Sequence, residues 1–119
     1  MVYNLDRHRQ LLRRSQDLKN QEKARFTENE NEFFELSKYN VAVEEHIFWT
    51  HRYQVALLME NFLNRKIDGE LLCQGVYGLR RQLLNTFENF TLELIANSEN
   101  TKNFQPDERS KKLSGFLTV

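Results

Sequence analysis

The residues whose side chains could carry metal or acid–base chemistry are few, and their spacing brings none of them together. His46 and His51 are five positions apart, which is about 140° around a helix, so they do not share a face. Glu44-Glu45-His46 lacks the Glu-x-x-His spacing that di-iron helical bundles use. We therefore predict no metal site and no cofactor, and we expect both histidines to lie partly buried beside Trp49.

The single cysteine is a nucleophile without a base. Cys73 lies one turn into an expected helix, but no histidine is near it in sequence, so we predict a small packing residue. Gly75 and Gly78 do not form a phosphate loop, because no strand precedes them and no Lys-Ser/Thr pair follows. They indicate either close approach of a neighbouring helix or a weak point in the helix, which costs about 1 kcal/mol for each glycine relative to Ala. One cysteine excludes an intrachain disulfide and favours a reducing compartment, cytoplasmic or inside an organelle. We predict that the chain is not an enzyme.

Charge is the remaining clue to function, and it is arranged in blocks that cancel. The net charge is +0, but residues 1–25 carry seven Lys or Arg against three acids. A basic helix of this kind could bind the phosphates of a nucleic acid, so a helical RNA-binding or scaffold protein is the alternative function. The candidate contacts for this alternative are Arg7, Arg9, Arg13, Arg14, Lys19, Lys23 and Arg25.

An acidic block follows the basic one. Residues 26–49 carry six Glu against one Lys, and such a surface could attract a basic protein partner, for example a toxin domain. The candidate partner contacts are Glu28, Glu30, Glu32, Glu35, Glu44 and Glu45. The same pattern also has structural explanations: the first helix packs antiparallel to the second with complementary charges, or the acids form a solvated helix face.

The elements that must position these side chains are clearest over Tyr53–Ile95, which is typical of two amphipathic helices joined by an elbow at residues 64–70. Each arm carries apolar residues at steps of three and four. Asp68 is expected to cap the second arm, which contributes about 1 kcal/mol, and Ile67 with Leu72 forms a hydrophobic staple. A connection this short places the two helices antiparallel and adjacent.

Upstream of the hairpin, a first helix is expected over residues 5–25, and Thr27 with Glu30 fits a capping box that starts a second helix. No Gly or Pro separates the two, so one continuous helix is the alternative. Downstream, the polar residues 97–100 end the hairpin, and Pro106 opens a last, short helix. The chain then stops on the apolar residues 115–119. We expect this last element to be truncated.

The second helix is expected to be long. Apolar residues recur every seven positions, at Phe34, Val41, Phe48, Val55 and Phe62. A sustained repeat of this kind predicts one helix that supercoils slightly against its neighbours. From Thr27 to Asn64 an unbroken helix would be about 57 Å long, so we expect a kink near Asn40 or within His46–Thr50.

Length and composition limit the fold class. With 119 residues, of which 39% are hydrophobic and 29% charged, the chain is expected to form a single helical domain over residues 1–119. Four Gly and one Pro leave too few turns for a β-sandwich. The predicted class is all-α, with three to four antiparallel helices and a long central helix, as a bundle or helical hairpin. No apolar run reaches membrane-spanning length and no signal peptide is recognisable, so a membrane is not an expected partner.

The elbow and its flanks, Leu57–Leu71, resemble the opening of colicin-D-type immunity proteins, a bacterial self-protection family. The family has a helix ending in a Phe-Leu-Asn turn, then Ile, a cap residue and acids that start the next helix. The matching residues here are Phe62, Leu63, Asn64, Ile67, Asp68 and Glu70. Two departures stand against the match: the stretch before Tyr53 is longer than in the family, and the chain stops early.

The resemblance implies an all-helical, non-enzymatic protein. Members of the family inhibit a toxin ribonuclease by covering its positively charged active site with acidic side chains. The matched residues are structural, so no toxin-binding residue carries over. The leading hypothesis is a non-catalytic, protein-binding inhibitor of the immunity type that acts through the glutamates of residues 28–45. The alternatives are the RNA-binding or scaffold protein and a fragment without retained function, and the oligomeric state is open.

Overall fold

The computed structural model describes residues 2–20 and 30–113, and all regular elements of this part are helices. Four are α-helices: α1 (Leu5–Asn20), α3 (Glu30–Thr50), α4 (Arg52–Leu63) and α5 (Gly69–Ile95). Two short 3₁₀ helices follow, η1 (Glu99–Thr101) and η2 (Glu108–Leu113). The all-α prediction is confirmed for the described residues. The expected helix end at Arg25 and the capping residue Thr27 lie outside them.

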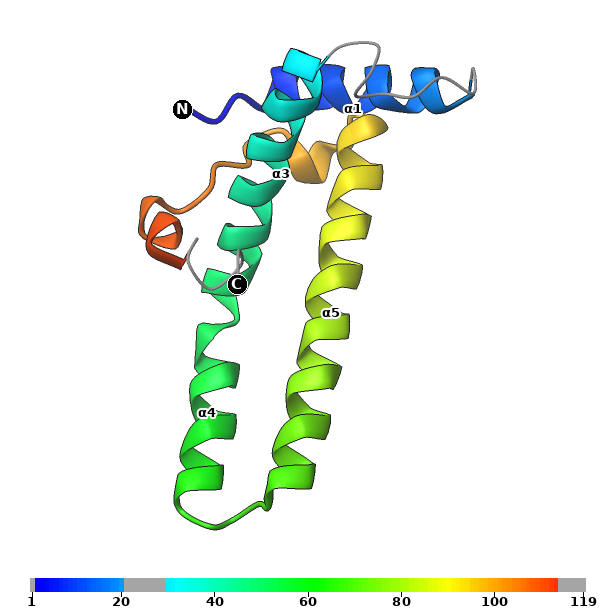
Figure 1. Ribbon diagram of the computed structural model, residues 1–119. Coiled ribbons are helices and arrows are strands. Elements are labelled where there is room, and N and C mark those ends of the chain that lie inside the picture. Colours follow the sequence, from blue (N-terminus) through cyan, green and yellow to red (C-terminus); the bar gives the residue numbers. More distant parts are fainter. Residues whose placement is uncertain (1, 21–29, 114–119) are drawn as a thin grey trace.

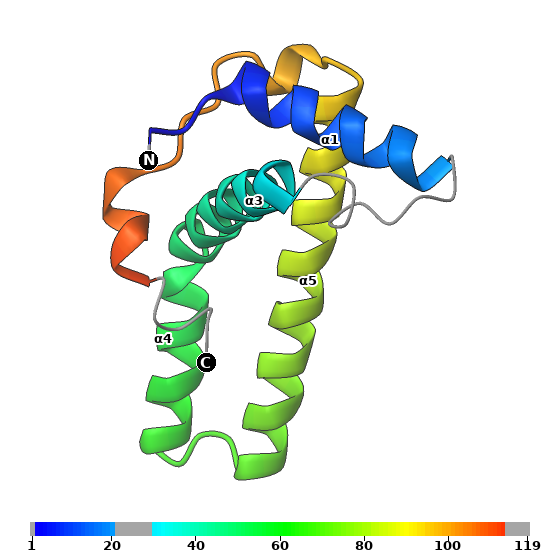
Figure 2. The same ribbon diagram turned by 45° about the horizontal axis from the view of Figure 1, so that its top comes forward.

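The helices form an elongated hairpin with a crossing helix at one end. α3 and α4 follow each other along one side, and α5 returns antiparallel beside them (Figure 1). α1 lies across the ends of α3 and α5 instead of running alongside α3 (Figure 2). The expected antiparallel packing of the first two helices is therefore wrong. The pairing of α4 with α5 agrees with the prediction, because a short elbow leaves the chain no room to separate them.

The buried core lies at the end where α1 crosses. Its fully or nearly buried apolar residues are Tyr3, Leu11, Tyr39, Val43 and Ile47, and partly buried side chains from α5 and the segment before η2 pack against them, among them Leu83, Phe87, Phe90 and Phe104. α4 contributes no buried residue at all. The arm formed by α4 and the first half of α5 is thus only two helices thick, with no third element described against it.

The long central helix is broken at His51, one residue beyond the window His46–Thr50 in which a kink is expected. The hydroxyl of Thr50 donates to the Ile47 carbonyl at 2.8 Å, and the ring nitrogen Nδ1 of His51 lies 2.8 Å from the same oxygen. The backbone N–H of His51 bonds instead to the Phe48 carbonyl at 3.1 Å. Two neighbouring side chains therefore compete for one helical acceptor, which interrupts the ladder between α3 and α4.

The elbow has the capping geometry that the sequence predicts. Asp68 has an extended backbone, and its Oδ1 accepts from the N–H of Leu71 at 2.8 Å. Arg65 ends the turn after α4 with φ 60, a left-handed conformation usually taken by glycine. At the other end of α5, Asn97 has φ 57 and the N–H of Ser98 bonds back to the Glu93 carbonyl at 2.9 Å. These contacts fix both ends of the longest helix.

The two glycines of α5 differ in their surroundings, which gives a matched test. A Cβ at Gly75 would lie 2.7 Å from Cδ2 of Leu58, whereas a Cβ at Gly78 would meet nothing within 4 Å. Gly78→Ala is therefore expected to raise the free energy of unfolding by about 0.5–1 kcal/mol, through helix propensity alone. Gly75→Ala should give none of this gain, because Leu58 must move. Urea unfolding of both variants checks this, and an equal gain at both sites would contradict close packing at Gly75.

Candidate interaction surface

Basic side chains of α1 fasten this helix to the rest of the molecule. The guanidinium of Arg7 makes two hydrogen bonds to the Glu35 carboxylate, at 3.0 and 2.8 Å. Arg9 donates to the Leu94 carbonyl at 2.8 Å, and Arg13 donates to the Ile95 carbonyl at 2.6 and 3.0 Å. These carbonyls belong to the last turn of α5, where the helix dipole favours positive charge. Lys19 is exposed, and Lys23 and Arg25 lie outside the described residues.

The glutamates proposed as a partner-binding face do not form one continuous surface. Glu32 and Glu35 face α1, where they pair with Arg14 at 3.5 Å and with Arg7. Glu45 is 5% exposed, and its burial raises the pKa of its carboxyl group. The remaining three lie apart: Glu30 is exposed at the start of α3, Glu44 lines an apolar groove described below, and Glu28 lies outside the described residues.

Two ion pairs, Arg7 with Glu35 and Arg14 with Glu32, thus join the basic block on α1 to the acidic block on α3. The guanidinium of Arg7 lowers the pKa of the Glu35 carboxyl group through their hydrogen bonds. Both side chains are about one-third exposed, so solvent screens part of the attraction. A double-mutant cycle of Arg7→Ala and Glu35→Ala is expected to give a small favourable coupling energy in urea unfolding. A coupling energy of zero would mean that this ion pair does not contribute to holding α1 in place.

His8, which the sequence did not single out, is the centre of a buried cluster of polar side chains. Its ring is fully buried and stacks on Tyr39, with Nδ1 2.8 Å from the Tyr3 hydroxyl and Nε2 2.8 Å from Oδ1 of Asn40. Because the amide oxygen of Asn40 can only accept, Nε2 carries the proton and Nδ1 accepts from Tyr3. Burial lowers the pKa of His8 and raises that of the Tyr3 hydroxyl. The cluster is closed on itself and offers no open position to a substrate.

The other chemically capable residues are dispersed. Nδ1 of His46 accepts from the backbone N–H of Asp107 at 2.9 Å and so holds η2 against α3. Cys73 is exposed, contrary to the expected packing role. Within residues 2–20 and 30–113, no three His, Cys, Asp or Glu side chains come close enough to hold a metal ion.

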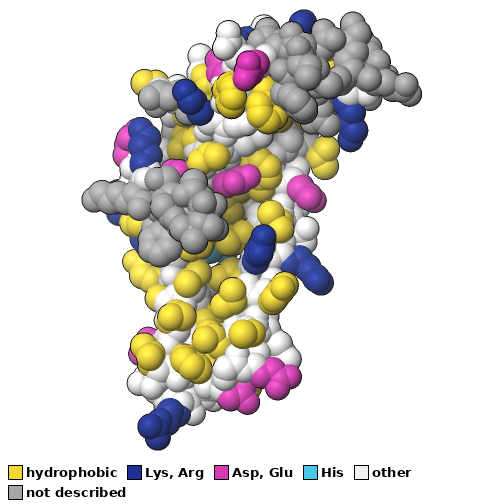
Figure 3. Space-filling model, in the orientation of Figure 1, with side chains coloured by type: hydrophobic (Ala, Val, Ile, Leu, Met, Phe, Trp, Pro, Cys, Tyr) yellow, Lys and Arg dark blue, Asp and Glu magenta, His cyan; other side chains and the backbone are white. Residues whose placement is uncertain are grey.

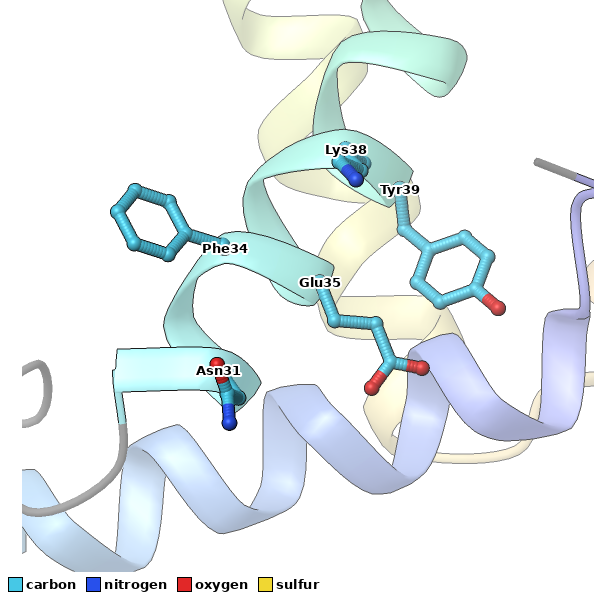
Figure 4. Close-up of a pocket in the computed structure, with 5 residues that line it drawn as sticks. All are labelled: Asn31, Phe34, Glu35, Lys38 and Tyr39. Atoms are coloured by element: carbon cyan, nitrogen blue, oxygen red, sulfur yellow. The ribbon is translucent and has the colours of Figure 1, made fainter.

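A hollow on α3 is lined by Asn31, Phe34, Glu35, Lys38 and Tyr39, which all come from this one helix (Figure 4). Figure 4 shows the side chains of Glu35 and Tyr39 on the side facing α1 and that of Phe34 pointing away from them. The carboxylate of Glu35 is already bound by Arg7. The hollow is therefore a shallow depression on one helix, and its only acidic side chain, Glu35, is already paired with Arg7.

The groove between the two arms of the hairpin is the most developed apolar surface. It encloses about 440 Å³, and its lining comes from α3, α4 and α5: Glu44, Ile47, Phe48, Val55, Leu58, Val76, Leu79, Arg80, Leu83, Leu84 and Phe87. Val76 is 47% exposed and Leu84 51% exposed. Figure 3 shows hydrophobic side chains gathered over this part of the molecule. We call the surface formed by these lining residues the hairpin groove.

The sequence predicts an apolar stripe on each arm, and the structure shows that many large apolar side chains of the arms, on and beside these stripes, are exposed to solvent. Large apolar side chains of the two arms that are at least 39% exposed include Tyr53, Leu57, Met59, Phe62, Leu63, Leu71, Val76, Tyr77 and Leu84. The exposure of these side chains could have been expected from the number of helices available to cover them. The described residues supply no further long apolar helix that could cover the hairpin.

Comparison with known proteins identifies no family. No protein-family model matches the chain, and neither a curated protein nor a solved structure matches it significantly. None of the described helices has the length and apolarity needed to cross a bilayer.

Proposed function

We propose that this chain is a non-catalytic, protein-binding helical module, and that the hairpin groove receives an amphipathic helical partner. The observation that carries the proposal is a groove with apolar walls from three helices and open to solvent. Isolated exposed apolar residues are ordinary, but a continuous apolar face of this kind marks an interaction site. A helix that lays its apolar side into such a groove is a common recognition mode.

The charge blocks give less support to the two functions that they suggest. An inhibitor of the immunity type needs acids that are free to meet a basic partner, but Glu32 and Glu35 pair with arginines of α1. An RNA-binding helix needs free cations, but Arg7, Arg9 and Arg13 bind groups of α3 and α5. An immunity-type inhibitor is one form that the proposed module could take, and the elbow resemblance is its support.

Site-specific photo-crosslinking tests the proposal. A benzoylphenylalanine at Leu84, inside the hairpin groove, is compared with one at the next position, Asn85, which is exposed but does not line the groove. In cells that express the chain, we expect an adduct with a protein segment from position 84 and little from position 85. Mass spectrometry should locate the adduct in an amphipathic helix. Equal labelling at both positions, or no adduct at 84, would contradict the proposal.

A further inference from the structure

We propose that the occupant of the hairpin groove is a second copy of this chain, which packs its own groove against the first in an antiparallel, two-fold symmetric dimer. This inference rests on the proposed function and names its partner. It gives a two-helix arm the opposing pair of helices that a four-helix arrangement requires. Two-fold pairing of identical surfaces is also the commonest way in which soluble chains associate.

The charges that border the groove are complementary to each other. Glu44 and Arg80 both line it, in walls that are otherwise apolar. Across residues 2–20 and 30–113, neither side chain has a hydrogen bond or ion pair. Burial without a partner raises the pKa of the Glu44 carboxyl group. The groove therefore presents one unpaired acid and one unpaired base, the combination that a self-complementary surface needs.

The position of these two charges fixes the register. Leu58 of α4 faces Gly75 of α5, which gives a reference level. Counted from it at about 1.5 Å per residue, Arg80 lies about 7.5 Å toward the α1 end, and Glu44 at most about 21 Å, because the helix breaks at His51 between Leu58 and Glu44. The two charges are therefore separated by at most about 13.5 Å along the hairpin.

A two-fold axis that crosses the hairpin midway between the two charges passes close to the level of Leu84. Rotation about this axis brings Glu44 of each copy to the level of Arg80 of the other. Because both residues line the groove, their long side chains then meet across it as two ion pairs between the copies. Leu84 of one copy then lies beside Leu84 of the second copy. The exposed leucine at this level thus gains an apolar neighbour.

The available area suits a dimer of moderate affinity. About 20 residues of each arm give a face roughly 30 Å long and 20 Å wide, on the order of 600 Å². Stable complexes bury about 800 Å² on each partner, so dissociation should be observable at micromolar concentration. The apolar centre would supply most of the affinity, and the two charge pairs would fix the register.

A charge-exchange experiment tests the register with the full-length chain. Light scattering coupled to gel filtration, from about 1 to 100 µM chain, should show wild-type dimers at the upper end. Glu44→Arg and Arg80→Glu should each weaken dimerisation at least tenfold, because each places like charges opposite each other twice. An equimolar mixture of the two variants should form a 1:1 heterodimer with the wild-type affinity, because both pairs are then restored. An ion pair within one chain could not produce this rescue.

Arg81→Glu is the matched control, since Arg81 is exposed and does not line the groove; it should dimerise like the wild type. A wild-type chain that stays monomeric throughout overturns the dimer. If the Leu84 crosslink then reaches a different protein, the proposed function stands and only the second copy is excluded. A wild-type dimer that neither Glu44→Arg nor Arg80→Glu weakens overturns the inference as well, because the charges would not face each other.

Discussion

Leu94→Ala is expected to lower the free energy of unfolding by about 3 kcal/mol. Leu94 is fully buried near the end of α5, where its carbonyl accepts from Arg9 of the crossing helix. The shorter side chain would leave a cavity at the point where α1 is held, and the loss combines lost burial with lost packing. Urea unfolding followed by circular dichroism measures the change.

Leu92 provides the matched control for this prediction, because it lies two residues away on the same helix and is 64% exposed. Leu92→Ala should cost no more than about 0.5 kcal/mol. Similar decreases in the free energy of unfolding for both variants would mean that Leu94 contributes no more to the core than an exposed leucine does.

Acid should destabilise the protein through His8. Burial lowers the pKa of this ring from its usual value of 6.5. Below about pH 6.5, His8 is therefore protonated in the unfolded chain while it stays neutral in the folded chain. The stability is therefore complete above about pH 6.5 and declines as the pH falls toward the folded-state pKa, by up to about 1.4 kcal/mol per pH unit. Burial lowers the pKa of His46 in the same direction, which adds to the slope.

His8→Gln isolates the contribution of the buried ring, because an amide can still hydrogen-bond to Asn40 but does not titrate. Unfolding midpoints in urea at pH 7.5 and pH 5 should differ less for this variant than for the wild type. Its stability at pH 7.5 will also fall, since the packing against Tyr3 and Tyr39 changes, so the pH dependence is the decisive measurement. An unchanged pH dependence would contradict the role of His8.

The local parts of this fold could be predicted from the sequence, and the long-range parts could not. The cap at Asp68, the end of α5 near Asn97 and the antiparallel hairpin all depend on residues within a few positions of each other. The crossing of α1 depends instead on Arg9 and Arg13 reaching carbonyls more than 80 positions away, and no periodicity encodes such a contact.

The candidate surface illustrates the same limit. The apolar stripes of the hairpin could be recognised, but a stripe does not say whether its partner is in the same chain or in another. The acidic block could be recognised too, whereas its pairing with α1 through Glu32 and Glu35 depends on how the helices cross. Four arginines of the basic block, Arg7, Arg9, Arg13 and Arg14, and two glutamates of the acidic block, Glu32 and Glu35, are thus bound within the molecule.

The attachment of α1 to the end of α5 also determines when the first helix can find its place. Its acceptors are the carbonyls of Leu94 and Ile95, so during synthesis α1 leaves the ribosome long before its binding site exists. Sequence-distant contacts of this kind form late and slow folding. The α4–α5 hairpin, whose contacts are local, is expected to form first and to serve as the template on which the N-terminal helix closes the structure.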